Sequence, residues 1–166
     1  MRFGTIFAIF VQKIKPMSNY KIENGKKITA AVVIINSDGD ILGCHTTGKP
    51  QDGGYDFPKG CVEDNESDVE GAIRECFEET GIKVNKENLL DCGIHPHNKE
   101  KNIHIFLYKT ETIPLFGLAC TSYFENKVGK MTPEVDGYLI VPKERRRIFN
   151  KVLWNKFEII DFFNKG

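Results

Sequence analysis

The sequence lacks an excess of charge of either sign and lacks a long hydrophobic run. Its 166 residues contain 23 Lys+Arg and 23 Asp+Glu. Because attraction to nucleic acid or anionic membrane grows with surplus Lys and Arg, this balance gives no general argument for either partner. The only membrane-like stretch, Phe3 to Val11, has about half of the roughly 20 apolar residues that a membrane-spanning helix needs. We therefore expect no membrane partner.

Cysteine pairs at metal-binding or redox spacing are also absent. The five cysteines are widely scattered and form no Cys-x-x-Cys pair, which argues against a zinc knuckle or a redox dithiol. His95, His97 and His104 lack nearby cysteine or carboxylate ligands at zinc spacing. The sequence predicts a reduced, cytoplasmic protein without zinc.

Internal repeats and low-complexity tracts are absent as well, whereas apolar residues are plentiful enough for a core. Hydrophobic residues make up 40% of the chain and aromatic residues 11%. This length and composition predict one folded domain. We place that domain at residues 21–166 and treat residues 1–20 as an N-terminal extension whose role the sequence does not define.

The order of apolar and polar segments predicts a mixed α/β sandwich. The β-branched run 27–35, a turn at Asp38-Gly39 and residues 41–44 are typical of a hairpin of core strands. Segment 48–55 is polar and glycine-rich and is expected to be a loop, and 110–136 is expected to be a long irregular insertion. The remaining expected elements are three strands and a C-terminal helical segment, at residues 89–94, 103–108, 137–141 and 142–165.

One helix is well defined by its own residues. Six residues recur at helical spacing and predict one buried stripe: Val69, Ala72, Ile73, Cys76, Phe77 and Thr80. Ser67 and Glu70 form a capping box at its start, and Gly81 stands where a left-handed C-terminal cap belongs. The pattern predicts a helix over residues 67–80.

Three glutamates crowd the other face of this helix. Glu75 lies three and four residues before Glu78 and Glu79, and like charges at that spacing destabilise a helix by about 0.2–0.5 kcal/mol per pair. A divalent cation would reverse the sign of this interaction, because Mg²⁺ and Mn²⁺ prefer hard oxygen ligands. The helical string alone also fits an ordinary solvated acidic face.

A wider spacing favours the metal interpretation. Gly60, Glu66 and the run from Arg74 to Ile82 match the pattern G-x5-E-x7-R-E-U-x-E-E-x-G-U, where U is apolar, at every specified position. The sequence therefore resembles the Nudix hydrolases, which split a nucleoside diphosphate linked to another moiety. The resemblance implies an α/β/α sandwich with a mixed β-sheet, in which the box forms a loop, a helix and a second loop.

The resemblance also implies roles within the box. Glu75, Glu78 and Glu79 would bind Mg²⁺ or Mn²⁺, and Gly60 would offer its carbonyl oxygen to the metal. Glu78, Glu79 and Arg74 would take part in catalysis, with Arg74 bracing the site. Glu66 and Gly81 would be structural parts of the motif.

Members of the family take their general base either from the box helix or from a loop outside it. Glu134, just before the strand expected at 137–141, lies where many members keep an additional functional glutamate. We interpret Glu134 as a metal ligand or catalytic base; the alternative is a surface loop residue.

The substrate is indicated less directly. Phe57-Pro58-Lys59 resembles the segment before the box in dinucleoside polyphosphate hydrolases and RNA-decapping members, where the lysine contacts phosphate. Lys59 and Phe57 are therefore candidate substrate-binding residues, with a plain surface residue as the alternative for Lys59. Tyr123 and Phe124, in the long insertion, are candidates for stacking on a nucleobase.

These markers favour a nucleotide-type substrate, either dinucleoside polyphosphates or nucleotide-capped or 5′-phosphorylated RNA. Pro96 lies near the position of a proline found in ADP-ribose-specific members, so hydrolysis of ADP-ribose or of nucleotides in a sanitising role stays open. A Nudix module that binds nucleotide or an RNA end without cutting it is the alternative of another class. The oligomeric state is not indicated by the sequence.

Overall fold

The structure is a computed structural model that describes residues 19–166. The apolar stretch at residues 3–11 lies outside the described residues, as does most of the expected N-terminal extension. Tyr20, at the end of that extension, forms a β-bridge with Glu63. This residue therefore already contacts the domain.

The main β-sheet is mixed. Its strands are β1 (Ile22–Glu23), β2 (Lys26–Ile35), β3 (Ile41–Thr46), β4 (Tyr55–Asp56), β5 (Lys59–Cys61), β6 (Leu89–Pro96), β7 (Lys101–Lys109) and β10 (Val135–Val141). The continuous order is β10-β3-β2-β7-β6, in which β2 and β7 run parallel and the other neighbours antiparallel. The short strands β1 and β5 pair with β2, and β4 pairs with β3.

The expected hairpin of β2 and β3 is formed only at its turn. The two strands pair at Ile35 and Ile41, where the side chain of Asn36 accepts hydrogen bonds from the backbone N–H groups of Asp38 and Asp40. Beyond this point β4 takes the place of β2 beside β3, at Cys44 and His45, and β2 takes β5 as its neighbour at residues 29–31. The other edge of β3 pairs with β10. This divergence makes room for β5 beside the centre of the sheet.

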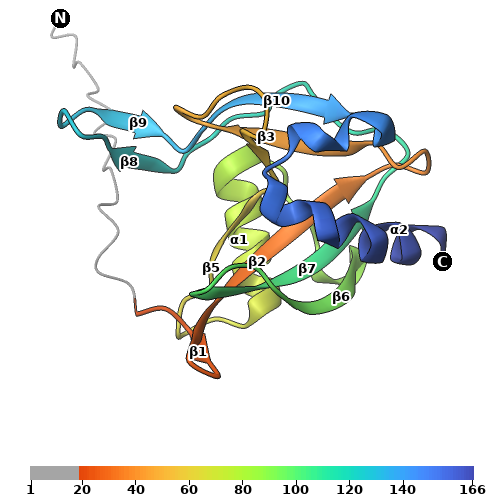
Figure 1. The fold of residues 1–166 in the computed structure, drawn as a ribbon, viewed down its shortest axis with the longest axis horizontal. Helices are drawn as coiled ribbons and strands as arrows, with labels where there is room; N and C mark the ends of the chain where they lie inside the picture. The colour runs from red at the N-terminus through yellow and green to blue at the C-terminus, as the bar shows by residue number, and fades with distance from the viewer. Residues whose placement is uncertain (1–18) are drawn as a thin grey trace, which may run out of the picture.

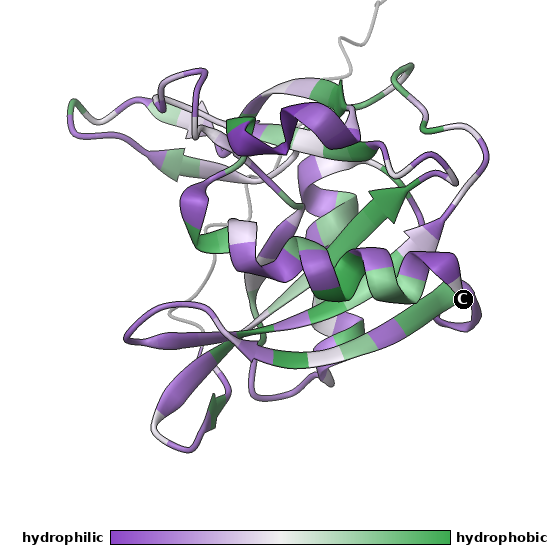
Figure 2. Ribbon diagram, turned by 45° about the vertical axis from the view of Figure 1, so that its right-hand side comes forward, coloured by the Kyte–Doolittle hydropathy of each residue, from purple (hydrophilic) through white to green (hydrophobic). Residues whose placement is uncertain are grey.

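Two helices cover opposite faces of the sheet, with α2 (Phe157–Lys165) in front of it and α1 (Asp68–Thr80) behind it in Figure 1. Side chains of a strand alternate between faces, and β2 shows this clearly: Val32 and Ile34 pack with the α1 side of the core, whereas Val33 and Ile35 pack with the α2 side. Buried on both faces, β2 is hydrophobic along most of its length (Figure 2). The α/β/α sandwich is confirmed.

The prediction of one helical segment over residues 142–165 is wrong in part. The segment consists of two 3₁₀ helices, η2 (Lys143–Ile148) and η3 (Lys151–Lys156), followed by α2. Between η2 and η3, Phe149 is extended and buried and forms a bridge with Tyr55. Asn150 then caps η3 by accepting a hydrogen bond from the Val152 N–H. Core packing of Phe149 therefore interrupts the helix.

The expected irregular insertion contains a short hairpin, β8 (Tyr123–Glu125) and β9 (Met131–Pro133), which projects from the body of the molecule (Figure 1). A further 3₁₀ helix, η1 (Lys86–Asn88), follows α1. Within residues 19–166, no helix has the length and apolarity needed to cross a bilayer.

Candidate metal centre

Helix α1 carries Glu75 and Glu79 into the interior. The helix begins at the capping box of Ser67 and Glu70 and ends at Gly81, whose backbone is left-handed with φ 77°. Both features confirm the prediction from sequence. Glu75 and Glu79 lie one turn apart and are only 4% and 8% exposed, so they do not form a solvated acidic face. Phe77, expected in the buried stripe, is instead 41% exposed.

Gly60 leaves space for one of these carboxylates. It lies in β5, opposite Ala30 of β2, and a Cβ at this position would come closer than 3.0 Å to the carboxylate of Glu75. Any side chain here would displace Glu75. The glycine is therefore needed because the Glu75 carboxylate approaches its backbone closely. Its backbone conformation does not require glycine, since its φ is not in the left-handed region.

Glu134 brings a third carboxylate from a distant part of the chain. It lies between β9 and β10, where its N–H donates to the Ser122 carbonyl oxygen at 2.9 Å and its Oε2 accepts from the Ser122 hydroxyl at 2.8 Å. Oxygens of Glu75, Glu79 and Glu134 all lie within 4.8 Å of one another. This three-carboxylate cluster is the candidate metal centre.

Arg74 fastens the cluster to the loop that precedes α1. Its guanidinium donates to both carboxylate oxygens of Glu66, at 2.6 and 3.0 Å, and to the Cys61 carbonyl oxygen at 3.2 Å. It also donates to Glu75 at 2.7 Å. Glu66 in turn accepts from the Glu63 N–H at 2.9 Å. The planar fork of an arginine suits such simultaneous bonding, and here it fixes the orientation of Glu75.

Glu78 lies outside the three-carboxylate cluster. Its carboxylate is 3.4 Å from Arg74, and its side chain is 26% exposed. Of the four glutamates for which a metal or catalytic role is predicted, the structure brings together Glu75, Glu79 and Glu134. The role of Glu78 stays a prediction.

The negative charges of the cluster act on one another, as the pKa of Glu79 shows. Burial raises the pKa of the Glu79 carboxyl well above its usual range, Glu75 and Glu134 raise it further, and nearby Lys59 opposes them. Buried like charges are unfavourable unless a cation is present. Two buried carboxylates, a third beside them and a glycine that clears their approach form an all-oxygen donor set, which fits Mg²⁺ or Mn²⁺.

Lys59 lies beside the cluster. Its backbone N–H donates to Glu79 Oε2 at 3.1 Å, and its ammonium group contacts Asp56 at 2.8 Å. Burial alone would lower the pKa of Lys59, but the negative charges of Asp56 and Glu79 raise it above its ordinary value. Lys59 is therefore held as a cation next to the candidate metal centre.

Two hollows meet at Lys59 and Glu134. One, of about 270 Å³, is also lined by Thr29, His97 and Lys101. The other, of about 390 Å³, is also lined by Lys49 and Phe124. The cluster therefore opens on two sides into hollows that carry lysine side chains, of which the smaller has the more polar lining.

Three other predicted substrate-binding residues differ in their surroundings. Phe57 is buried at 1% exposure and packs against Phe149 and Phe157 in the core, and it also belongs to the lining of the larger hollow. Phe124 is 40% exposed and lines the larger hollow, whereas Tyr123 is 49% exposed and is not among the residues that line it.

Sequence reasoning missed several residues of the site. Asp56 holds Lys59, and Ser122 holds Glu134, although neither belongs to the box. His97 lines the smaller hollow, and its Nδ1 atom is buried without a hydrogen-bond partner among the described residues. Asp56 precedes Lys59 by three residues, which was the one available signal; nothing in the sequence marks Ser122.

A family model of the NUDIX domain matches residues 25–144. The chain belongs to the Nudix hydrolase family. The match contains β2, the box and Glu134, and ends at the start of η2.

Relatives of this Nudix chain occur in viruses and in fungi. It is 35% identical over 129 residues to a 17.7 kDa protein of the e-segB intergenic region of Enterobacteria phage T4, covering 71% of this chain and 83% of that protein. It is 31% identical over 87 residues to the mRNA decapping complex subunit 2 of Schizosaccharomyces pombe, covering 50% of this chain and 10% of that protein. It is 28% identical over 144 residues to the mRNA-decapping protein g5R of African swine fever virus, covering 86% and 48%. The chain thus spans less than half the length of both decapping proteins.

Solved structures share the Nudix fold. The MutT protein from Methanosarcina mazei Go1 aligns with a TM-score of 0.58 and 23% identity, covering 88% of this chain and 100% of that one. An Ap4A hydrolase from C. elegans aligns with a TM-score of 0.57 and 18% identity, covering 84% and 98%. At these identities the likeness shows the fold alone.

Proposed function

We propose that this chain is a divalent-metal-dependent pyrophosphohydrolase that cleaves dinucleoside polyphosphates or nucleotide-capped or 5′-phosphorylated RNA. The observation that carries the proposal is the three-carboxylate cluster, with oxygens of Glu75, Glu79 and Glu134 within 4.8 Å of one another. Metal-binding carboxylates combined with a nearby cation are the usual means of binding and activating a phosphoanhydride.

Each residue around the cluster has a defined task in this proposal. Glu75, Glu79 and Glu134 hold the metal, and Arg74 keeps Glu75 in place from the side of the box loop. Lys59, oriented by Asp56, meets a phosphate oxygen of the substrate. When bound, Mg²⁺ or Mn²⁺ would neutralise phosphate oxygens and lower the pKa of a water molecule.

The substrate class is supported by the comparisons and by the shape of the site. Two relatives are named as mRNA-decapping proteins, and the Phe57-Pro58-Lys59 segment resembles that of dinucleoside polyphosphate hydrolases. Such substrates carry a polyphosphate between two nucleosides, or between a nucleoside and an RNA chain. The hollows on both sides of Lys59 and Glu134 leave room for a group at each end of the polyphosphate.

The test is product analysis from a substrate panel with Mg²⁺ in oxygen-18 water. The panel contains diadenosine tetraphosphate, capped RNA, 5′-triphosphate RNA and ADP-ribose. We expect one ¹⁸O atom in a phosphate product of one of the first three, which also identifies the phosphorus attacked. Preferred cleavage of ADP-ribose would contradict the substrate class. Binding without any cleavage would contradict the hydrolase and favour a nucleotide-binding module.

Variants separate the proposed roles. Glu79→Gln should lower kcat by orders of magnitude, with Glu158→Gln, an exposed position on α2, as the control. The same change at Glu78 tests the prediction that remains for this residue. If Glu78→Gln loses kcat but keeps its Mn²⁺ affinity, Glu78 acts as a base; if it loses both, Glu78 is a ligand.

A further inference from the structure

A third hollow lies away from the metal centre, against the 3₁₀ helices. It has a volume of about 740 Å³ and is lined by residues of the loop 48–54, of η2, of η3 and of the link between these two helices: Asp52, Gly53, Arg145, Arg147, Ile148, Asn150, Lys151 and Trp154. This volume falls within the range of about 300–1,000 Å³ typical of ligand sites. None of these residues has a role in the proposed hydrolysis.

The hollow concentrates positive charge in a chain whose net charge is zero. In a 3₁₀ helix, residues three apart lie on the same side. Lys143 and Arg146 of η2 therefore share one side, where both pair with Asp161. Arg145 and Arg147 lie on the other sides of η2, are exposed, and form no ion pair within residues 19–166.

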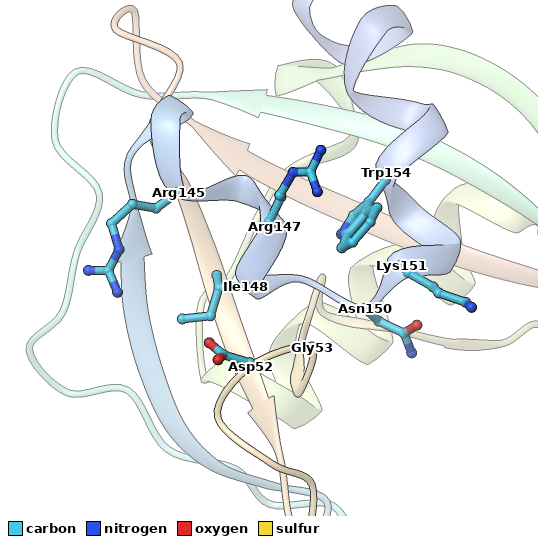
Figure 3. A pocket seen from close by; sticks show the side chains of 8 residues that line it. All are labelled: Asp52, Gly53, Arg145, Arg147, Ile148, Asn150, Lys151 and Trp154. Carbon is cyan, nitrogen blue, oxygen red and sulfur yellow. The ribbon is translucent and has the colours of Figure 1, made fainter.

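Lys151 adds a third cation to the hollow, whereas Asp52 is the one carboxylate in its lining. In the view of Figure 3, Arg145 and Lys151 lie at opposite ends, and Arg147 and Trp154 lie between them. The cations are thus distributed along the hollow rather than gathered at one point. The successive phosphates of a nucleic-acid strand would require such a distribution.

Trp154 supplies a fixed aromatic surface. Its indole N–H donates to the Phe149 carbonyl oxygen at 2.9 Å, which sets the orientation of the ring, and the residue is 41% exposed. The Arg147 guanidinium lies 5.2 Å from the ring centroid. An exposed aromatic ring with one arginine beside it and further cations along the same hollow is a combination with which proteins bind single-stranded nucleic acid, because bases stack on the ring while cations contact the phosphates. An acidic peptide would use the charges but not the ring.

The hollow is fastened to the segment that leads into the metal centre. The Gly53 N–H donates to the Ile148 carbonyl oxygen at 2.9 Å, and the Asn150 N–H donates to the Tyr55 carbonyl oxygen at 2.8 Å. Lys49, in the same loop, lines the hollow of about 390 Å³ at the metal centre, together with Glu79 and Glu134. Lys49 and Gly53 are four positions apart in the chain, a span of at most about 14 Å. One loop thus separates the two sites.

We infer that the hollow around Trp154, Arg145, Arg147 and Lys151 is a second binding site for single-stranded RNA, which holds nucleotides downstream of a 5′ end placed in the metal centre. The inference deepens the proposed function and rests on it for the position of the 5′ end. The binding of RNA at Trp154 does not require hydrolysis and is tested separately.

Trp154 is the only tryptophan of the chain, so its fluorescence reports directly on this hollow. Oligo(U) is titrated in EDTA, which prevents metal-dependent cleavage. We expect quenching of the fluorescence on binding. The charge-reversing pair Arg145→Glu and Arg147→Glu should weaken binding at least tenfold, because RNA affinity depends on phosphate neutralisation. The pair Lys86→Glu and Lys165→Glu, at exposed positions, changes the net charge equally and should have a much smaller effect.

The same variants are then compared in hydrolysis. The Arg145→Glu and Arg147→Glu pair should raise KM for 5′-triphosphate RNA at least tenfold and leave kcat/KM for diadenosine tetraphosphate unchanged. The inference would be overturned if RNA bound without quenching Trp154, or if both charge-reversing pairs weakened RNA binding equally. It would also be overturned if polyglutamate competed for the site as well as RNA does. If no phosphoanhydride is cleaved but oligo(U) still quenches Trp154, the proposed function fails and the RNA site stands.

Discussion

Gly60, Ser122 and Glu134 show how single residues build the metal centre. Glu134 reaches the two glutamates of α1 because Ser122 holds both its backbone and its carboxylate. Gly60 contributes by having no side chain in the space that the Glu75 carboxylate occupies. Gly60 thus contributes space and Ser122 contributes hydrogen bonds. Both contributions can be removed by substitutions that leave the three carboxylates in the sequence.

Gly60→Ala should displace the Glu75 carboxylate and weaken Mn²⁺ binding, because the added Cβ would come closer than 3.0 Å to it. Overpacking of this kind costs about 1–3 kcal/mol of stability, so the variant should still fold. Calorimetric titration with Mn²⁺ measures the effect. Gly137→Ala is the matched control, since its Cβ would meet only His45 Cβ at an ordinary 3.5 Å. Equal Mn²⁺ affinity of both variants would show that the position of Glu75 does not matter for the metal.

At the scale of elements, α2 is fixed to the rest of the fold by an ion pair. Arg146 of η2, only 8% exposed, donates to both carboxylate oxygens of Asp161 of α2 and to the Gly39 carbonyl oxygen. Burial alone would raise the pKa of Asp161, but the hydrogen bond from Arg146 and then the one from Lys143 lower it below its ordinary value. This arrangement ties η2, α2 and the turn between β2 and β3 together.

Asp161→Asn should lower the free energy of unfolding by about 3 kcal/mol at neutral pH, because it leaves the buried Arg146 without its counter-charge. A carboxyl with a lowered pKa stabilises the fold above its unfolded pKa of about 3.9, and this stabilisation is lost as the pH falls through the folded pKa. The two proteins should therefore converge in stability below about pH 4. Urea unfolding at several pH values measures this, with Asp38→Asn in an exposed turn as the control. A difference that persists unchanged at low pH would contradict the ion-pair explanation.

Elements that depend on local signals could be predicted from the sequence, and those that depend on distant packing could not. Helix α1 begins and ends as its capping box and Gly81 indicate, because caps are local hydrogen bonds. The break at Phe149 was missed, since it follows from pairing with Tyr55 nearly a hundred positions away. The divergence of β2 and β3 was missed for the same reason, because the partner that separates them, β5, is chosen by the whole sheet.

At the scale of the whole molecule, the box places two carboxylates, and the rest of the chain completes the site. The spacing of the box predicted the family, and the match over residues 25–144 confirms it. Glu134 was suggested only by the family resemblance, and its neighbour Ser122 could not be found, since their contact depends on how β9 leads into β10. The burial of Glu75 and Glu79 was also hidden from periodicity, because β5 covers the face that a single helix would expose.

The stability of the molecule should depend on the metal in the wild type and much less in Glu79→Gln. Without a divalent cation, the variant should be at least as stable, because it removes a buried charge that faces like charges. With Mn²⁺ at about 100 times its Kd, the wild type should gain about 2.7 kcal/mol, whereas the variant should gain little. Thermal unfolding in EDTA and in Mn²⁺ measures both, with Glu158→Gln expected to follow the wild type. Equal gains from Mn²⁺ in all three proteins would place the ion elsewhere.

The most direct test of the metal centre is anomalous diffraction from a crystal of the wild-type protein grown with Mn²⁺ and a non-hydrolysable dinucleoside polyphosphate. The account predicts an anomalous peak within about 2.0–2.6 Å of carboxylate oxygens from Glu75, Glu79 and Glu134, with substrate phosphate oxygens on its open side. A map in which Mn²⁺ lies away from these three side chains while the nucleotide is bound would contradict it.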